Sequence, residues 1–132
     1  MSERTVMSSD ARFGWTALLV WACLGVALET AHAFKLASYL DDALTRLLLT
    51  LAHAHGVGLA LVVLLFAATV PEPPHWVRRA LRFAAIAMPL GFALGAVGHP
   101  EGDPSIGIVL APLGALALIA ALAGVVARAW RP

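Results

Sequence analysis

The amino-acid sequence predicts an all-α protein, an integral membrane up-down bundle of four helices. Three observations favour this fold class. The 132 residues are 61% hydrophobic and 13% charged, whereas a soluble domain has about 45–50% apolar and about 25% charged residues. Four long apolar stretches alternate with short polar segments. Four spans of about 20 residues with their connections use up the chain, so residues 1–132 are expected to form a single transmembrane domain.

We expect the four spans at about residues 13–34, 44–70, 80–98 and 106–129. Each is long enough to cross about 30 Å of hydrocarbon at about 1.5 Å per residue. The first span ends at the polar segment 35–42, the second at the proline-rich segment 71–74, and the third at the turn-forming segment 99–104. Because these connections are short, successive spans should run antiparallel.

The charge distribution predicts the orientation in the membrane. Arginines lie in the N-terminal tail, the second loop and the C-terminus, whereas the first and third loops with their helix ends carry only Lys35 and Arg46. By the positive-inside rule, both termini should face the cytoplasm and the acidic first and third loops should face outward. We expect a multi-pass protein of a bacterial inner membrane. Nucleic acid is not expected as a partner, because the chain lacks a long basic run outside the spans.

The first span has a competing interpretation as a signal peptide. Arg12, the apolar run that follows it and the pattern Ala31-His32-Ala33 match the parts of such a peptide. The apolar run is longer than the usual h-region of about 7–15 residues. We therefore expect this segment to be a membrane span.

The ionisable residues within the expected spans lie mainly toward the outer face. A charged side chain at the centre of a bilayer costs about 2.5–3.5 kcal/mol by insertion measurements, so such residues are functional candidates. Four of the five histidines and one glutamate lie on this side. The candidate site consists of Glu29, His32, His53, His55 and His99, with Glu101 and Asp103 as further ligands at its rim.

Helical spacing indicates which of these side chains can act together. Glu29 and His32 are three residues apart, which places them about 60° apart on one helical face. His53 and His55 are two residues apart, about 200° around the axis, so they cannot both point at one centre from a straight helix. One should face the bundle core, and the other a neighbouring helix, a partner subunit or lipid.

Imidazole and carboxylate groups are ligands that suit iron, copper or zinc, and histidines on helices also bind haem iron. The leading hypothesis is an outward-facing site for a metal ion or haem, with His53 and His55 as cofactor-binding residues. The protein would then be a subunit of a respiratory or metal-handling complex, or a homo-oligomer.

Two alternatives remain open. The first is a small oligomeric proton-coupled transporter or channel that uses Glu29 and the histidines. The second is a structural accessory subunit without chemistry of its own, in which the polar groups satisfy one another. The sequence has no phosphate-binding loop, nucleophile elbow or metalloprotease helix motif. Whether the protein is an enzyme therefore stays open.

Overall fold

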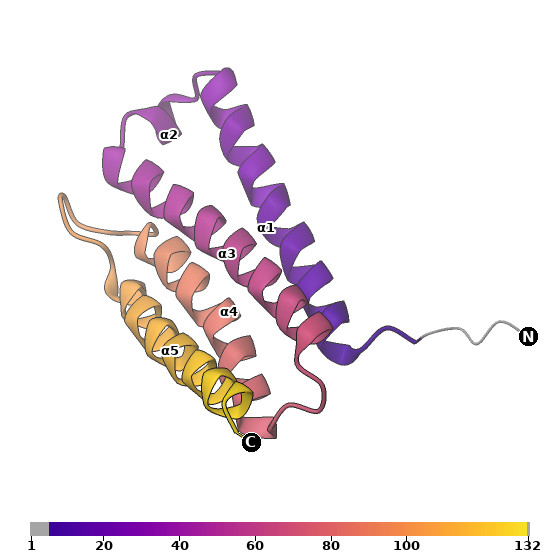
Figure 1. Cartoon of the computed structure of the whole chain (residues 1–132). Helices are drawn as coiled ribbons and strands as arrows, with labels where there is room; N and C mark the ends of the chain where they lie inside the picture. Colours follow the sequence, from indigo (N-terminus) through magenta and orange to yellow (C-terminus); the bar gives the residue numbers. More distant parts are fainter. Residues whose placement is uncertain (1–5, 132) are drawn as a thin grey trace, which may run out of the picture.

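The computed structural model describes residues 6–131 and consists of helices and their connections over that range. The four long helices are α1 (Ser9–Ala33), α3 (Ala43–Thr69), α4 (His75–Gly95) and α5 (Leu110–Ala129). A short helix α2 (Ala37–Leu40) follows α1, and a 3₁₀ helix η1 (Ile106–Val109) leads directly into α5. Successive long helices run antiparallel, so that the start of α1 and the end of α5 lie at the same end of the molecule (Figure 1).

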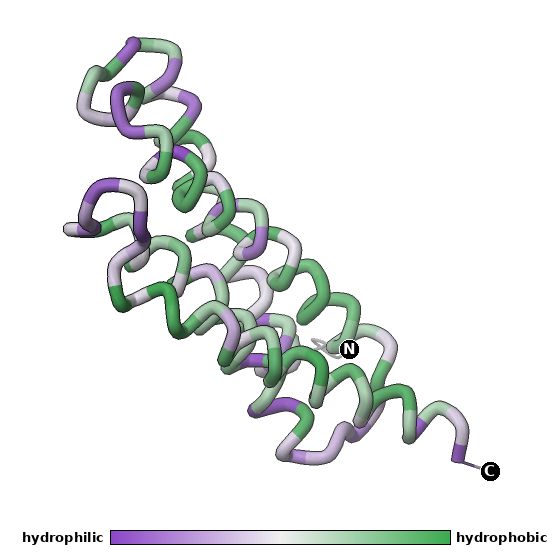
Figure 2. Tube along the Cα trace, turned by 90° about the vertical axis from the view of Figure 1, so that its left-hand side faces the viewer, coloured by the Kyte–Doolittle hydropathy of each residue, from purple (hydrophilic) through white to green (hydrophobic). Residues whose placement is uncertain are grey.

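The long helices lie in a row whose order is α1, α3, α4, α5. The most extensive packing is between α4 and α5, between α1 and α3, and between α3 and α4, and Figure 1 shows α1 and α5 at the two ends of the row. Hydrophilic residues gather mainly toward the helix ends (Figure 2). The buried core lies among α3, α4 and α5 and consists of Leu59, Val63, Phe66, Val77, Leu81, Ala85, Met88, Ala111 and Ala121.

Within residues 6–131, three helical segments are long and apolar enough to cross a membrane. They are α1, α3 and the continuous segment Ile106–Ala129 that joins η1 to α5. Helices of this length and composition are typical of a membrane protein. The helix α4 is not among them, because its first two turns carry three arginines: Arg78, Arg79 and Arg82.

The helix α4 differs most from the sequence prediction. A span was expected at residues 80–98, whereas the helix begins at His75 and ends at Gly95. Its N-cap is Pro74. A proline favours the start of a helix because its φ is fixed near the helical value, and because the amide hydrogen that it lacks would have no acceptor within the helix at that position. The prediction counted only apolar residues, although arginine is a good helix former and the helix continues through all three.

The other helices lie close to the expected stretches. The helix α1 starts at Ser9 rather than near Phe13, because the Ser8 hydroxyl accepts a hydrogen bond from the Ala11 amide and caps the helix. The helix α3 is capped by Asp42. The 3₁₀ helix η1 leads into α5, in which Pro112 is the third residue. A proline is tolerated there because the amides of the first helical turn have no acceptor within the helix.

Glycines let the helices approach closely at the main interfaces. A Cβ atom on Gly56 of α3 would overlap the indole of Trp21 from α1, and one on Gly91 of α4 would overlap the backbone of Ala111. A Cβ atom on Gly114 of α5 would lie 2.6 Å from the backbone nitrogen of Met88. Contacts of this kind hold helices together where lipid surrounds them, because lipid offers no hydrophobic driving force between helices.

A buried carboxylate joins the beginnings of α1 and α4. Asp10 is only 5% exposed. Its two oxygens accept hydrogen bonds from Arg78 Nε at 2.9 Å and from Arg82 Nε at 2.8 Å. The Arg82 guanidinium also lies over the ring of Phe13, 5.5 Å from its centroid. The carboxylate therefore offsets part of the positive charge at the start of α4.

We expect Gly56→Ala to destabilise the protein by about 1–3 kcal/mol, because the new methyl group would force the Trp21 indole out of its place and overpacking costs about that much. The matched control is Gly58→Ala, at a position where a Cβ atom meets nothing within 4 Å. The control should gain up to about 1 kcal/mol from helix propensity. Unfolding midpoints in detergent micelles measure both effects, and equal shifts for the two variants would contradict the close contact between Trp21 and Gly56.

Candidate functional site

A groove lined by polar side chains lies between α1 and α3 at the end where α2 connects them. Figure 1 shows the two helices separating toward α2. The inner part has a volume of about 260 Å³ and is lined by Gly25, Leu28, Glu29, His32, Tyr39, Thr50 and His53. The outer part adds Ala43, Arg46 and Leu47. The groove therefore brings together three of the expected site residues, namely Glu29, His32 and His53.

His53 is held in a fixed orientation by α1. Its Nδ1 lies 2.8 Å from the carbonyl oxygen of Trp21. A carbonyl can only accept, so Nδ1 carries the proton and Nε2 of the neutral ring carries a free lone pair. The ring occupies the space beside Gly25, where an added Cβ atom would lie 2.6 Å from Nδ1. The missing side chain at Gly25 thus makes the position of His53 possible.

Glu29 and His32 extend from the last turns of α1 and are exposed along the groove. Within residues 6–131, neither side chain has a hydrogen bond or an ion pair to another residue. Arg46 lies nearer the outer mouth, and its guanidinium donates to the carbonyl of Leu40 at the end of α2. The two α1 side chains are therefore free to bind a ligand that enters the groove.

His55 lies on a different side of α3 from His53. Its Nδ1 lies 2.8 Å from the carbonyl oxygen of Leu51, one turn earlier in the same helix. Its ring centroid is 4.8 Å from that of Phe92 in α4. His53 contacts α1 and His55 contacts α4, so the two imidazoles do not face one centre within a single chain, in agreement with their angular separation of about 200°.

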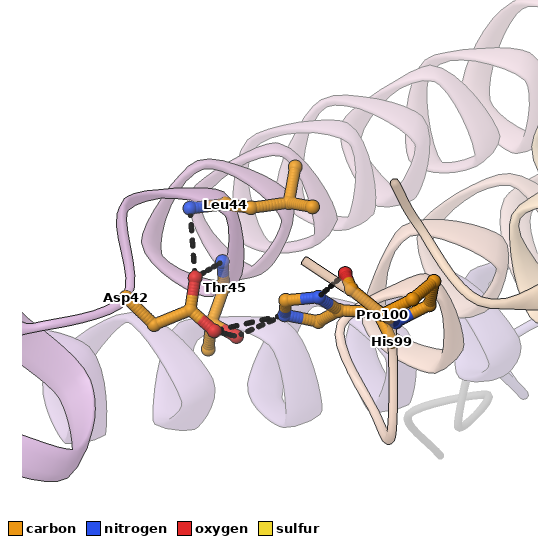
Figure 3. A network of polar contacts seen from close by, with 5 residues as sticks. All are labelled: Asp42, Leu44, Thr45, His99 and Pro100. Atoms are coloured by element: carbon orange, nitrogen blue, oxygen red, sulfur yellow. Dashed lines mark hydrogen bonds and ion pairs between the residues drawn. The ribbon is translucent and has the colours of Figure 1, made fainter. Parts of the chain in front are cut away.

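His99 lies outside the groove and connects the segment after α4 to the start of α3 (Figure 3). Its Nε2 is 2.8 Å from Asp42 Oδ2 and 3.0 Å from Thr45 Oγ1. Its Nδ1 donates to the carbonyl of Pro100 at 2.9 Å. Asp42 in turn accepts from the backbone amides of Leu44 and Thr45 and so caps α3.

The charged forms of His99 and Asp42 stabilise each other. Both nitrogens of the His99 ring face acceptors, which favours the imidazolium form. The hydrogen bond to Pro100, followed by the charge of Asp42, raises the pKa of His99 above its usual value. The backbone amide and the hydroxyl of Thr45 are the main causes that lower the pKa of Asp42.

The structure distributes the five expected site residues over three places. Glu29, His32 and His53 share the groove, His55 faces α4, and His99 pairs with Asp42. Glu101 and Asp103 are exposed in the segment after His99. Among the described residues, no three His, Cys, Asp or Glu side chains converge closely enough to hold a metal ion as they stand.

Sequence reasoning did not identify Gly25, Thr50 and Tyr39 as parts of the groove. Gly25 lies four residues before Glu29, and Thr50 lies three residues before His53, so helical spacing could have placed both on the same faces as the ionisable residues. Tyr39 belongs to the four-residue helix α2, which is too short to show a helical period.

No known protein family, curated protein or solved structure matches this chain.

The pair formed by His99 and Asp42 should make the stability depend on pH. The pKa of His99 is raised from 6.5, so its contribution is complete below about pH 6.5 and is lost as the pH rises through the folded-state pKa. The pKa of Asp42 is lowered from 3.8, so its contribution persists until the pH falls through that lower value. We expect His99→Gln to lower the unfolding midpoint more at about pH 5 than at about pH 9.

The control for this experiment is Asp42→Asn, because asparagine still caps α3 but carries no charge. This variant should lose the same pH-dependent part of the stability as His99→Gln, and combining the two changes should add little. An effect of His99→Gln that is the same at both pH values would contradict the ionic character of the contact.

Proposed function

We propose that the chain is a multi-pass protein of a bacterial inner membrane, with α1, α3, α4 and the segment from η1 to α5 as four antiparallel spans. The apolar character of three of them and their alternating directions support this arrangement. Both ends of the chain then face the cytoplasm, and Arg78, Arg79 and Arg82 lie at the cytoplasmic boundary, as the positive-inside rule favours. The groove between α1 and α3 opens toward the opposite side.

In this orientation the groove binds a transition-metal ion that arrives from the non-cytoplasmic side. The observation that carries the proposal is that Glu29, His32 and His53 line one groove in the half of α1 and α3 that faces outward. His53 presents Nε2 while its Nδ1 donates to a backbone carbonyl, which is the arrangement that orients most metal-binding histidines. Two imidazoles and one carboxylate suit zinc, copper or iron.

Binding by all three side chains requires Glu29 and His32 to turn toward His53. Both are exposed and make no side-chain hydrogen bond within residues 6–131, so this rotation breaks no hydrogen bond of either side chain. The metal ion would also give Glu29 the partner that a carboxylate inside a membrane span needs.

A haem bound by both His53 and His55 has less support in a single chain, because these imidazoles contact different helices. At the two ends of the helix row, α1 and α5 each have large apolar side chains that no other part of residues 6–131 covers. These faces would be covered by lipid, by further copies of the chain or by another subunit of a larger membrane complex.

A proton-coupled or ion-coupled transporter is the second candidate. The observation that favours it is that the carboxylate of Glu29 lines the groove and has no hydrogen bond or ion pair to another side chain among residues 6–131. The inner half of the interface between α1 and α3 is closely packed, however. A Cβ atom on Gly14 would lie 2.8 Å from side-chain atoms of Leu64, and Ala60 is fully buried. A path across the membrane would therefore have to run between copies of the chain.

Purified protein should bind about one equivalent of Zn²⁺ in a calorimetric titration, and His53→Gln should weaken this binding by at least about tenfold. Glutamine is the suitable replacement, because its amide can still donate to the carbonyl of Trp21 while it removes the Nε2 ligand. The matched control is His75→Gln, at an exposed histidine at the start of α4. This control should leave the affinity for Zn²⁺ unchanged.

The double variant Glu29→Gln/His53→Gln should bind no Zn²⁺ at the groove. If it bound Zn²⁺ as tightly as the unchanged protein, the metal site would have to be elsewhere. Proton flux into liposomes that is lost in Glu29→Gln, in a protein that binds no metal, would favour the transporter instead.

A further inference from the structure

A second pocket, shallow and wide open to the surroundings, lies on the side of α3 that faces away from the groove. It has a volume of about 460 Å³ and is lined by Ala54, His55, Gly58, Leu59, Val62, Met88 and Leu118. His55 supplies its polar lining, and the other side chains are aliphatic apart from the thioether of Met88. His55 is close to the middle of the 27-residue helix α3. In a protein that spans the membrane with α3, this pocket faces the hydrocarbon core.

The imidazole of His55 lines this pocket, and one of its two ring nitrogens has no hydrogen-bond partner among residues 6–131. Its Nδ1 donates to the carbonyl of Leu51 at 2.8 Å, so the lone pair of the neutral ring is on Nε2. The contact with Phe92, with ring centroids 4.8 Å apart, helps to fix the plane of the ring. Within residues 6–131, no group donates a hydrogen bond to Nε2.

Gly58 extends the pocket along the helix. It lies nearly one turn after His55, it is exposed, and an added Cβ atom would meet nothing within 4 Å. Glycine in a helix costs about 1 kcal/mol relative to alanine. Gly56 offsets this cost by admitting the Trp21 indole, whereas no side chain among residues 6–131 lies within 4 Å of a Cβ atom added to Gly58. The bare backbone beside His55 leaves room for a flat molecule.

We propose that this pocket binds a lipid-soluble ring compound of the hydroquinone class, whose hydroxyl group donates to Nε2 of His55 while its ring lies over Gly58. A hydrocarbon-facing pocket receives its ligand from the bilayer, and a lone acceptor selects a molecule with a hydroxyl donor. Haem fits less well, because its two propionates would need donors or cations and the other residues of the lining provide none. The inference rests on the proposed transmembrane position of α3, and it does not depend on metal binding in the groove.

Equilibrium dialysis in detergent micelles under argon, with duroquinol as the probe, tests this assignment. Duroquinol should bind saturably and at least about fivefold more tightly than its oxidised form duroquinone, whose carbonyls cannot donate to Nε2. His55→Phe keeps an aromatic ring against Phe92 but removes the acceptor, so it should abolish the preference for the reduced form. Gly58→Leu should fill the pocket and weaken the binding of both forms by at least about tenfold.

The matched control is Ala68→Leu, a similar enlargement at an exposed position of α3 outside this pocket, which should leave binding unchanged. Equal affinities of the unchanged protein for duroquinol and duroquinone would overturn the role of His55 as acceptor. No saturable binding, or binding that Gly58→Leu does not weaken, would overturn the pocket. His55→Phe should bind Zn²⁺ like the unchanged protein, so a failure of this inference can be distinguished from a failure of the metal site.

Discussion

The close approach of helices at glycine positions is the constraint on which the rest of this structure depends. Apolar side chains gain little by leaving lipid for another helix, so direct contact and hydrogen bonds between helices must supply the attraction. The indole of Trp21 lies against Gly56, and Gly114 lies against the backbone of Met88. The same device serves the groove, because Gly25 leaves the space in which His53 reaches a backbone carbonyl of α1. Helix packing and the candidate site therefore have one physical origin.

Much of the fold could be predicted from the sequence, because long apolar stretches bounded by caps and prolines indicate helices directly. The helix α3 begins after Asp42 and ends before the prolines of the segment 71–74, and both signals are visible in the sequence. The start of α4 was placed too late because hydropathy does not register a helix that continues through arginines. The order of the helices in the row depends on which helix faces carry glycines opposite large side chains. Because this depends on pairs of helices, it could not be predicted from any single segment of the sequence.

For the candidate site, the sequence could predict only how residues within one helix lie relative to one another. The spacing of Glu29 and His32 places them on one face, and both line the groove. The angle between His53 and His55 predicts that they diverge, but only the position of Gly25 in α1 decides that His53 is the one that enters the groove. His99 was grouped with the others because of its position near the outer ends of the helices. Its pairing with Asp42, 57 residues away in the sequence, is a consequence of how α3 and α4 pack and could not be derived from spacing.

Trp21 takes part in two contacts at once, since its indole lies on Gly56 and its carbonyl accepts the hydrogen bond of His53. A displacement of the His53 ring therefore acts on the backbone of α1 at Trp21, the same residue whose side chain packs in the interface with α3. A ligand that binds only when these two helices are packed together must stabilise that packing by mass action. By the same coupling, a change that loosens the interface must lower the affinity for the ligand by the same free energy. If such a ligand binds in the groove, its binding and the packing of α1 against α3 are therefore coupled, and a change in one changes the other.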